Sequence, residues 1–326
     1  MHGDFRAIDL FCGIGGNSWG AREAGVKIRA GFDIWQQAGD VYQTNFPEAR
    51  FYRGDLSVYR HADILQMKEE IGEIDLLLAS PECTSHSNAR GANPKDEKSL
   101  RLSWNVWRFA RVFRPRWMVI ENVPAMQKWS RYADFLRILR EKGGYHCREH
   151  ILDASYFGVP QSRKRLYIVC DREREAPETI TPPSNCKPPA IKDILKPNGA
   201  YPFSPLEKPG RAQKTLERAQ RGMNALGRET PFLMVYYGSE IKGGWQSLDE
   251  PLRTVTTRDR FALVQPDGRG GHAMRMLQPD ELQAAMGFPP EYNLACETRE
   301  EKIHMLGNAV CPPVMQAIVK TLTQAR

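Results

Sequence analysis

Three features are missing from this sequence of 326 residues, and each absence excludes a class of protein. The seven cysteines contain no C-x-x-C pair, which argues against a zinc ribbon and a disulfide framework and for a reducing cytosol. No stretch approaches the roughly 20 apolar residues that a membrane span requires. The N-terminus lacks the apolar core of a signal peptide. We therefore expect a soluble cytoplasmic protein that makes no membrane contact.

One group of potential metal ligands is present, formed by His146, Cys147 and His150. These residues lie in a segment with strand-like alternation, where neighbouring side chains point to opposite faces. Because a metal ion needs its ligands on one side, we expect no metal site here.

The charge of the chain is positive and unevenly placed. Lys and Arg total 46 against 39 Asp and Glu, which gives a net charge of +7. Residues 176–275 hold 15 of these cations and 10 of the anions, so this third of the chain supplies +5 of the +7. A basic segment of this kind favours a polyanionic partner such as nucleic acid.

The first half of the chain alternates short apolar runs with amphipathic segments. Such alternation predicts right-handed crossovers and an α/β fold with a Rossmann-like, doubly wound, mainly parallel sheet. The expected strands are 6–11, 27–33, 75–80, 117–121, 147–153 and 165–170, and the expected helices are 17–24, 34–45, 102–113 and 132–142.

The pattern changes after residue 175. Residues 177–209 contain nine of the 23 prolines, which is typical of an irregular segment. Strands of a small β-rich domain are expected at 232–237 and 253–257, and helices are expected from 279 and over 305–322. We therefore expect a discontinuous domain of residues 1–175 plus 304–326, an inserted domain of 176–275, and a hinge with a connecting helix over 276–303.

A glycine-rich turn, DLFCGIGG at residues 9–16, follows the first expected strand. Glycine permits close approach of the backbone to a ligand, and the next helix presents free N–H groups. Asp33 ends the second strand, where a carboxylate binds a ribose diol in a Rossmann-type site. The pattern indicates a nucleoside-containing cofactor, although a structural glycine turn stays open because Ser18 replaces the last fingerprint glycine. Asp55 follows another strand end and could contact an adenine amino group or lie in a solvated turn.

Two further strands end in reactive side chains. Cys83 follows the apolar run 76–79, and Glu121 follows the run 117–120. Because the carboxyl ends of strands in an α/β sheet carry the functional loops, a nucleophile and an acid there indicate an active site. Each residue alone has a structural alternative, since a cysteine at a strand end is ordinarily a small buried apolar residue. Arg163 and Arg165 could likewise form one solvated face of a strand.

Six motifs occur together in an order and at a spacing that resemble those of bacterial and phage DNA (cytosine-5)-methyltransferases. They lie at residues 9–16, 81–83, 121–123, 161–165, 275–289 and 307–310. The resemblance leaves roughly residues 172–270 unmatched apart from the dipeptide Thr254-Val255. It implies the sheet of an S-adenosylmethionine-dependent methyltransferase with a small, irregular, β-rich target-recognition domain inserted.

The resemblance also implies a reaction. Cys83 would add to C6 of cytosine, because C5 is not nucleophilic enough to attack a methyl sulfonium unaided. Glu121 would hold or protonate N3, while Arg163 and Arg165 would fix the carboxylate, the base carbonyl and nearby phosphates. The target base must be flipped out of the duplex to reach this pocket. The methyl donor would be S-adenosylmethionine, the product S-adenosylhomocysteine, and no metal would take part.

Binding residues follow from the same resemblance. In the cofactor site, Phe11 would stack on the adenine, Asp33 would bind the ribose and Asp55 the adenine amino group. The full expected cofactor set is Phe11, Gly13, Gly15, Gly16, Asp33, Ile34, Asp55, Pro81, Asn308 and Ala309. The expected contacts to DNA are Ser87, Gln161, Thr254, Val255, Arg258 and Arg260. Residues 88–99 form a plausible loop over the pocket.

The nucleophile motif departs from the common form of the family. Its Pro, Cys and Ser are present as Pro81, Cys83 and Ser87, whereas Glu82, Thr84 and His86 replace other residues. A carboxylate beside the thiol raises the thiol pKa and disfavours the thiolate. The paired arginines or a protonated His86 would offset this effect.

Three functions are compatible with these residues. The first is a prokaryotic or phage enzyme that acts as a monomer on a specific site in double-stranded DNA, with a cognate restriction endonuclease as a further partner. The second is an RNA cytosine methyltransferase, since one branch of the family methylates tRNA, but the basic insertion suits readout of a DNA site. The third is a DNA-binding protein with a decayed active site, against which the intact Cys83, Glu121, Arg163 and Asn308 argue.

Overall fold

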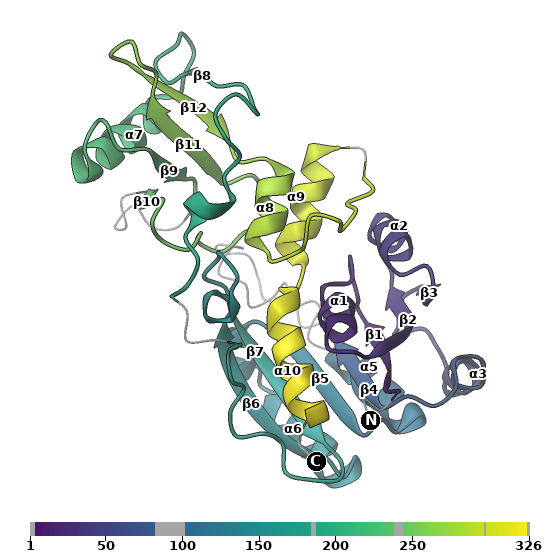
Figure 1. Cartoon of the computed structure of the whole chain (residues 1–326). Helices are drawn as coiled ribbons and strands as arrows, with labels where there is room; N and C mark the ends of the chain where they lie inside the picture. The colour runs from purple at the N-terminus through teal and green to yellow at the C-terminus, as the bar shows by residue number, and fades with distance from the viewer. Residues whose placement is uncertain (1–3, 82–101, 184–186, 238–243, 297, 325–326) are drawn as a thin grey trace.

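The computed structural model of the chain contains a large sheet and a smaller one (Figure 1), and it describes residues 4–81, 102–183, 187–237, 244–296 and 298–324. The large sheet has the order β3-β2-β1-β4-β5-β7-β6. Its strands are β1 (Arg6–Leu10), β2 (Lys27–Asp33), β3 (Arg50–Arg53), β4 (Leu76–Ala79), β5 (Trp117–Asn122), β6 (His146–Asp153) and β7 (Lys164–Asp171). Strands β1 to β5 pair in parallel, whereas β7 is antiparallel to β5 and β6. The expected mainly parallel sheet is confirmed.

The apolar runs of β4 and β5 are continuous because both faces of the sheet are covered. Leu76 and Leu78 pack on one side, and Leu77 and Ala79 on the other. The first side is covered by α1 (Gly16–Glu23), α2 (Gln36–Asn45) and α10 (Pro312–Gln324), and the second by α3 (His61–Ile71), α5 (Ser103–Phe113) and α6 (Tyr132–Arg137) with its π-helical continuation η3 (Ile138–Lys142). Within the described ranges, no helix is long and apolar enough to cross a membrane.

The smaller sheet is antiparallel and has the order β10-β9-β11-β12-β8. Its strands are β8 (Ser204–Pro205), β9 (Phe232–Val235), β10 (Trp245–Ser247), β11 (Phe261–Pro266) and β12 (His272–Met276), and α7 (Gln213–Leu226) packs on its outer face. Alternate residues of β9 separate the two faces, because Phe232 and Met234 pack beneath α7 while Leu233 and Val235 point inward.

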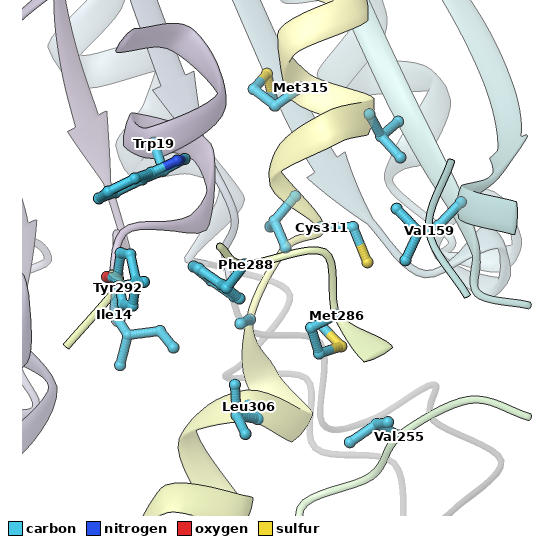
Figure 2. Packing of buried hydrophobic residues seen from close by; sticks show 14 of the residues in the cluster. Ile14, Trp19, Val159, Val255, Met286, Phe288, Tyr292, Leu306, Cys311 and Met315 are labelled. Carbon is cyan, nitrogen blue, oxygen red and sulfur yellow. The ribbon is translucent and has the colours of Figure 1, made fainter. Parts of the chain in front are cut away.

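The inner face of the small sheet belongs to the same apolar cluster as one face of the large sheet. Leu233 and Phe261 from the small sheet share this cluster with Leu76 and Val119 from the large one. Figure 2 shows part of it, where side chains from α1, α10 and the segments between the sheets come together. The two sheets therefore share one buried core.

Two helices connect the small sheet to α10, and they are α8 (Pro279–Ala285) and α9 (Arg299–Asn308). A buried ion pair ties β12 to α8, with Arg275 Nη2 2.6 Å from Glu281 Oε1 and Arg275 Nη1 2.7 Å from Glu281 Oε2. Glu281 also accepts a hydrogen bond from Gln278 N at 2.9 Å, so the start of α8 is held against the end of the sheet.

Two expectations about secondary structure are wrong. Residues 253–257 form no strand, because their polar groups bind the neighbouring segment 161–163 instead of a sheet partner. The expected helix over 305–322 is two helices, α9 and α10, with a break at 309–311. Pro312 begins α10, where its missing N–H costs nothing, and a proline inside one long helix would break it.

Candidate active site

The glycine-rich turn connects β1 to α1 and leaves room on one side only. Its backbone has positive φ at Phe11 (56°), Gly13 (50°) and Gly15 (86°). A Cβ atom placed on Gly16 would lie 2.2 Å from Val310 O, whereas one on Gly13 would meet nothing within 4 Å. Gly16 is therefore needed for packing against the C-terminal segment, and the open space suited to a ligand lies beside Gly13.

Asp33, at the end of β2, holds this turn in place. Its Oδ2 accepts a hydrogen bond from Gly13 N at 2.8 Å, and its Oδ1 accepts one from Trp35 N at 2.9 Å. Burial raises the pKa of the Asp33 carboxyl, and the backbone hydrogen bonds oppose that rise. A carboxylate oxygen can accept two hydrogen bonds, so each oxygen of Asp33 has room for one more, for example from a hydroxyl group. The next residue, Ile34, is 63% exposed and presents apolar surface beside the turn.

A buried polar network lies beneath the same turn and was not foreseen from the sequence. Asp9 is fully buried and accepts hydrogen bonds from Ser18 Oγ at 2.8 Å and from Asn17 Nδ2 at 3.3 Å. Desolvation raises the pKa of Asp9 to about 7, against the opposing effect of those hydrogen bonds. Asn17 Nδ2 also lies 2.6 Å from Ser80 Oγ, so the network joins the turn to the end of β4.

The ends of β4 and β5 lie side by side. Asn122 Nδ2 donates a hydrogen bond to the backbone oxygen of the buried Pro81 at 3.0 Å, which fixes the point where the chain leaves β4. The sequence analysis gave Asn122 no role of its own, although it is the middle residue of the motif at 121–123. The expected nucleophile Cys83, its neighbours Glu82 and His86, Ser87 and the loop 88–99 lie outside the described residues.

Glu121, one residue before the end of β5, is a buried carboxyl paired with an arginine. It is 8% exposed, and its Oε1 lies 3.1 Å from Nε of Arg165, which comes from the adjacent antiparallel strand β7. Burial raises the pKa of Glu121, and the positive charges of Arg165 and then Arg163 oppose the rise. The pair therefore presents a carboxyl that binds a proton more readily than a solvated one.

Arg163 lies in a different environment from Arg165. Its guanidinium is buried and donates to three backbone oxygens: Nη1 to Val255 at 2.9 Å, and Nη2 to Gly307 at 2.9 Å and Ala309 at 3.0 Å. Burial lowers the pKa of Arg163 to about 10. The resemblance implied that the two arginines fix the carboxylate, the base carbonyl and nearby phosphates, and among the described residues Arg165 is the one that forms an ion pair with the carboxylate.

Three of the expected DNA contacts face the protein interior. Gln161 is fully buried, with Nε2 donating to Ala285 O at 3.0 Å and Oε1 accepting from Val255 N at 2.8 Å. Val255 is also buried, and the Thr254 hydroxyl donates to Ser162 O at 2.9 Å. Direct readout of DNA by Gln161 and Val255 is at odds with this burial. Their motifs mark internal contacts between segments.

The remaining expected residues lie nearer the surface. Arg258 is exposed, whereas the half-buried Arg260 donates from Nη1 to Tyr236 O at 3.1 Å. Asp55 accepts a hydrogen bond from Ser57 N at 2.8 Å, which is the turn that the sequence left open as an alternative. Asn308 is exposed at the end of α9, and Ala309 is buried. No group of three or more His, Cys, Asp or Glu side chains that could hold a metal occurs among the described residues.

Solved structures share the fold of this chain. A putative DNA modification methyltransferase encoded within a prophage of E. coli superposes with a TM-score of 0.71 at 19% identity, covering 98% of this chain and 99% of that one. The Dnmt2 methyltransferase of S. pombe superposes with a TM-score of 0.68 at 18% identity, covering 98% of each chain. The fold is therefore that of known methyltransferases.

The sequence comparisons identify the family. The family model for C-5 cytosine-specific DNA methylase matches residues 5–324, so the chain belongs to this family and the expected class, DNA cytosine-5 methyltransferase, is confirmed. Type II methyltransferase M1.HgaI of Avibacterium volantium is 24% identical over 97% of both chains. Type II methyltransferase M.HindV of Haemophilus influenzae is 31% identical over 201 residues, which span 58% of this chain and 62% of that protein. The latter alignment thus covers less than two thirds of its relative.

Proposed function

We propose that the protein transfers the methyl group of S-adenosylmethionine to C5 of a cytosine flipped out of a specific site in double-stranded DNA. The observation that carries this proposal is the buried pair of Glu121 and Arg165, 3.1 Å apart. Glu121 lies on β5, the strand next to β4, and Arg165 lies on β7, on the other side of β5. In the sequence, β4 is followed by Pro81 and then by Cys83. Because Cys83 follows β4 in the sequence, we infer that the nucleophile acts at the same end of the sheet as the proton-binding carboxyl.

The residues around the turn fit a nucleoside cofactor. Gly13 leaves open space, Asp33 keeps acceptor capacity for a ribose hydroxyl, and Ile34 and Phe11 offer apolar surface for the adenine. We assign the methionine end to Gly13 and the exposed Asn308. S-adenosylmethionine, when bound there, supplies an electrophilic methyl group.

Each reactive residue has one task in the proposed mechanism. The Cys83 thiolate forms a bond to C6 of the base, and the displaced electron pair moves into the ring towards N3. Glu121 holds a proton at N3, which its raised pKa favours, so the charge developing on the ring is neutralised. Arg165 keeps the carboxyl in position. After methylation a base removes the C5 proton, the bond between sulfur and C6 breaks, and Cys83 is regenerated.

DNA is the polymer that the inserted segment favours. We assign target recognition to residues 176–275, which carry an excess of five positive charges and contain most of the small sheet, and we assign the hinge to 276–303. Lys and Arg there would supply affinity for phosphates, with the exposed Arg258 among them. Since curated relatives are named Type II methyltransferases, we further propose a cytoplasmic monomer whose partner in the cell is a cognate restriction endonuclease.

Two linked experiments test this proposal. Bisulfite sequencing of DNA from cells that express the protein would first reveal the methylated site. A duplex with 5-fluorocytosine at that site should then trap the wild type covalently when S-adenosylmethionine is present, because the C5 fluorine cannot leave as a proton does. Cys83→Ala should form no adduct, whereas the control Cys296→Ala should trap normally.

The outcomes separate the alternatives. An adduct through a cysteine other than Cys83, or an active enzyme without an adduct, would overturn the assigned nucleophile. Transfer to tRNA and not to duplex DNA, assayed side by side, would establish the RNA enzyme. DNA binding without any transfer would establish the decayed protein.

A further inference from the structure

We propose that Arg163 is a positioning residue that does not touch the target base. Its guanidinium couples the recognition segment, residues 176–275, to the carboxyl of Glu121 and to the cofactor turn, residues 9–16. The inference rests on the proposed function, because it explains how the recognition segment is held in a fixed position relative to the reactive carboxyl and the cofactor turn. Three segments meet at this arginine, namely residues 160–163, 252–257 and 306–310, and we call their meeting point the joint.

The first two segments of the joint run side by side. Leu252 N donates to Pro160 O at 2.9 Å, and Ser162 N donates to Leu252 O at 2.8 Å. The Thr254 hydroxyl and the Gln161 side chain add the contacts to Ser162 O and Val255 N described above. This short parallel pairing attaches the recognition segment to the chain that enters β7. A displacement of one segment therefore displaces the other.

The third segment is held by the arginine itself. Gly307 and Ala309, whose backbone oxygens accept from Nη2, stand at the C-terminal end of α9. A buried cation at a helix C-terminus is favourable, since the unpaired carbonyl groups there carry partial negative charge. Nη1 reaches the recognition segment at Val255 in the same plane. One rigid guanidinium thus fixes two segments at once, which a flexible ammonium group cannot do equally well.

Close packing shows how tightly the third segment is enclosed. A Cβ atom on Gly307 would lie 2.3 Å from the backbone carbon of Thr256. Farther along the segment, Val310 O occupies the place of a Cβ atom on Gly16, at 2.2 Å. Val255, Met286 and Leu306 fill the apolar surroundings (Figure 2). The recognition segment therefore reaches the cofactor turn through backbone contacts with no intervening gap.

The joint also leads directly to the reactive carboxyl. Arg165, which pairs with Glu121, is only two residues beyond Arg163 on the chain that enters β7. A displacement of Val255 on binding the correct DNA site is thus transmitted to Arg165 by the chain and to Gly16 by the third segment. This arrangement gives Arg163 a role in target specificity as well as in rate.

The test compares Arg163→Met with Arg163→Lys, using Arg50→Met as the control. Arg50 lies on β3 in an exposed ion pair with Glu70, away from the joint. For Arg163→Met we expect three changes together: kcat lower by roughly 10²-fold, as positioning losses typically are, weaker S-adenosylmethionine binding, and a smaller ratio of specific to non-specific DNA affinity. Arg163→Lys should recover part of each quantity, and Arg50→Met should change none.

Gly307→Ala provides an independent perturbation, because it disturbs the joint without altering any charged group. Positioning predicts the same three changes in Gly307→Ala, and it predicts a double variant with Arg163→Met that is much less impaired than the product of the single effects. Multiplicative effects, or an Arg163→Met variant that loses kcat alone, would instead mean direct contact with the reacting base and would overturn the inference. A wild type that transfers to neither DNA nor tRNA would overturn the proposed function itself.

Discussion

The contact between Glu121 and Arg165, which we call the reactive edge, and the joint both depend on an arginine but use it differently. At the reactive edge, the Arg165 side chain is 17% exposed and pairs with a carboxyl on the neighbouring strand. At the joint, two residues earlier in the chain, Arg163 is 4% exposed and binds three backbone oxygens. The first contact joins two side chains and adjusts a proton affinity, while the second joins three segments and sets their relative position.

This difference shows that a motif alone does not define what its residues do. The spacing of Arg163 and Arg165 is that of one strand face, which suggests a shared task. The segment at 252–257 decides otherwise, because it covers Arg163 and leaves Arg165 beside Glu121. Variants of the two regions should therefore fail in different ways.

Glu121→Gln is the strongest test at the reactive edge. We expect the transfer rate to fall by about 10² to 10⁴-fold, since the amide cannot supply a proton at N3, while affinity for the duplex stays near that of the wild type. Single-turnover transfer and gel-shift titrations measure the two quantities. Wild-type transfer should also weaken as the pH rises through the raised pKa of Glu121, because the carboxylate then replaces the acid. An equal loss of DNA affinity would mean that Glu121 contributes to DNA binding and not to proton transfer.

Gly307→Ala should reduce stability at the joint. The added methyl group meets backbone that cannot easily move, so we expect a loss of about 1 to 3 kcal/mol in the free energy of unfolding. Arg165 donates to no backbone oxygen of the joint, and lysine keeps its positive charge beside Glu121. Arg165→Lys should therefore change that free energy by less than about 1 kcal/mol. Urea unfolding compares both with the wild type. Equal losses of stability in the two variants would contradict the claim that the joint, and not the reactive edge, holds segments of the chain together.

Asp9→Asn extends the comparison to a second buried carboxyl, through the pH dependence of stability. The pKa of Asp9 is raised to about 7, so its contribution to stability is full below its unfolded value near 3.8 and is lost as the pH rises towards 7. The asparagine variant should lack this decline, which we expect to be about 4 kcal/mol between pH 4 and 8 because one unit of pKa corresponds to about 1.4 kcal/mol. Thermal unfolding across that range measures it. A wild type with a flat profile would mean that Asp9 is ionised throughout.

Sequence patterns predicted the strands that are buried on both faces. The runs at β4 and β5 are apolar on both faces, so the parallel sheet and the position of Glu121 could be predicted. For β3 the sequence indicated a strand end before Asp55 but not the bounds of the strand, because its four residues, RFYR, are at most half-buried and form no apolar run. The internal contacts of Gln161 and Arg163 could not be predicted for a different reason, since only the folded chain shows that residues 252–257 contact them. Long-range packing of this kind leaves no local signal.

The apolar cluster shared by the two sheets also bears on protein engineering. Leu233, Val235, Phe261 and Leu263 form the face of the small sheet that joins the core of the large one. If residues 176–275 read the target, a segment transplanted from a relative would have to carry a matching inner face and would have to keep the apolar face beneath α7, so the connecting turns are the least constrained part. New target specificity is therefore best sought by exchanging those turns on the existing sheet, with the inner face left unchanged.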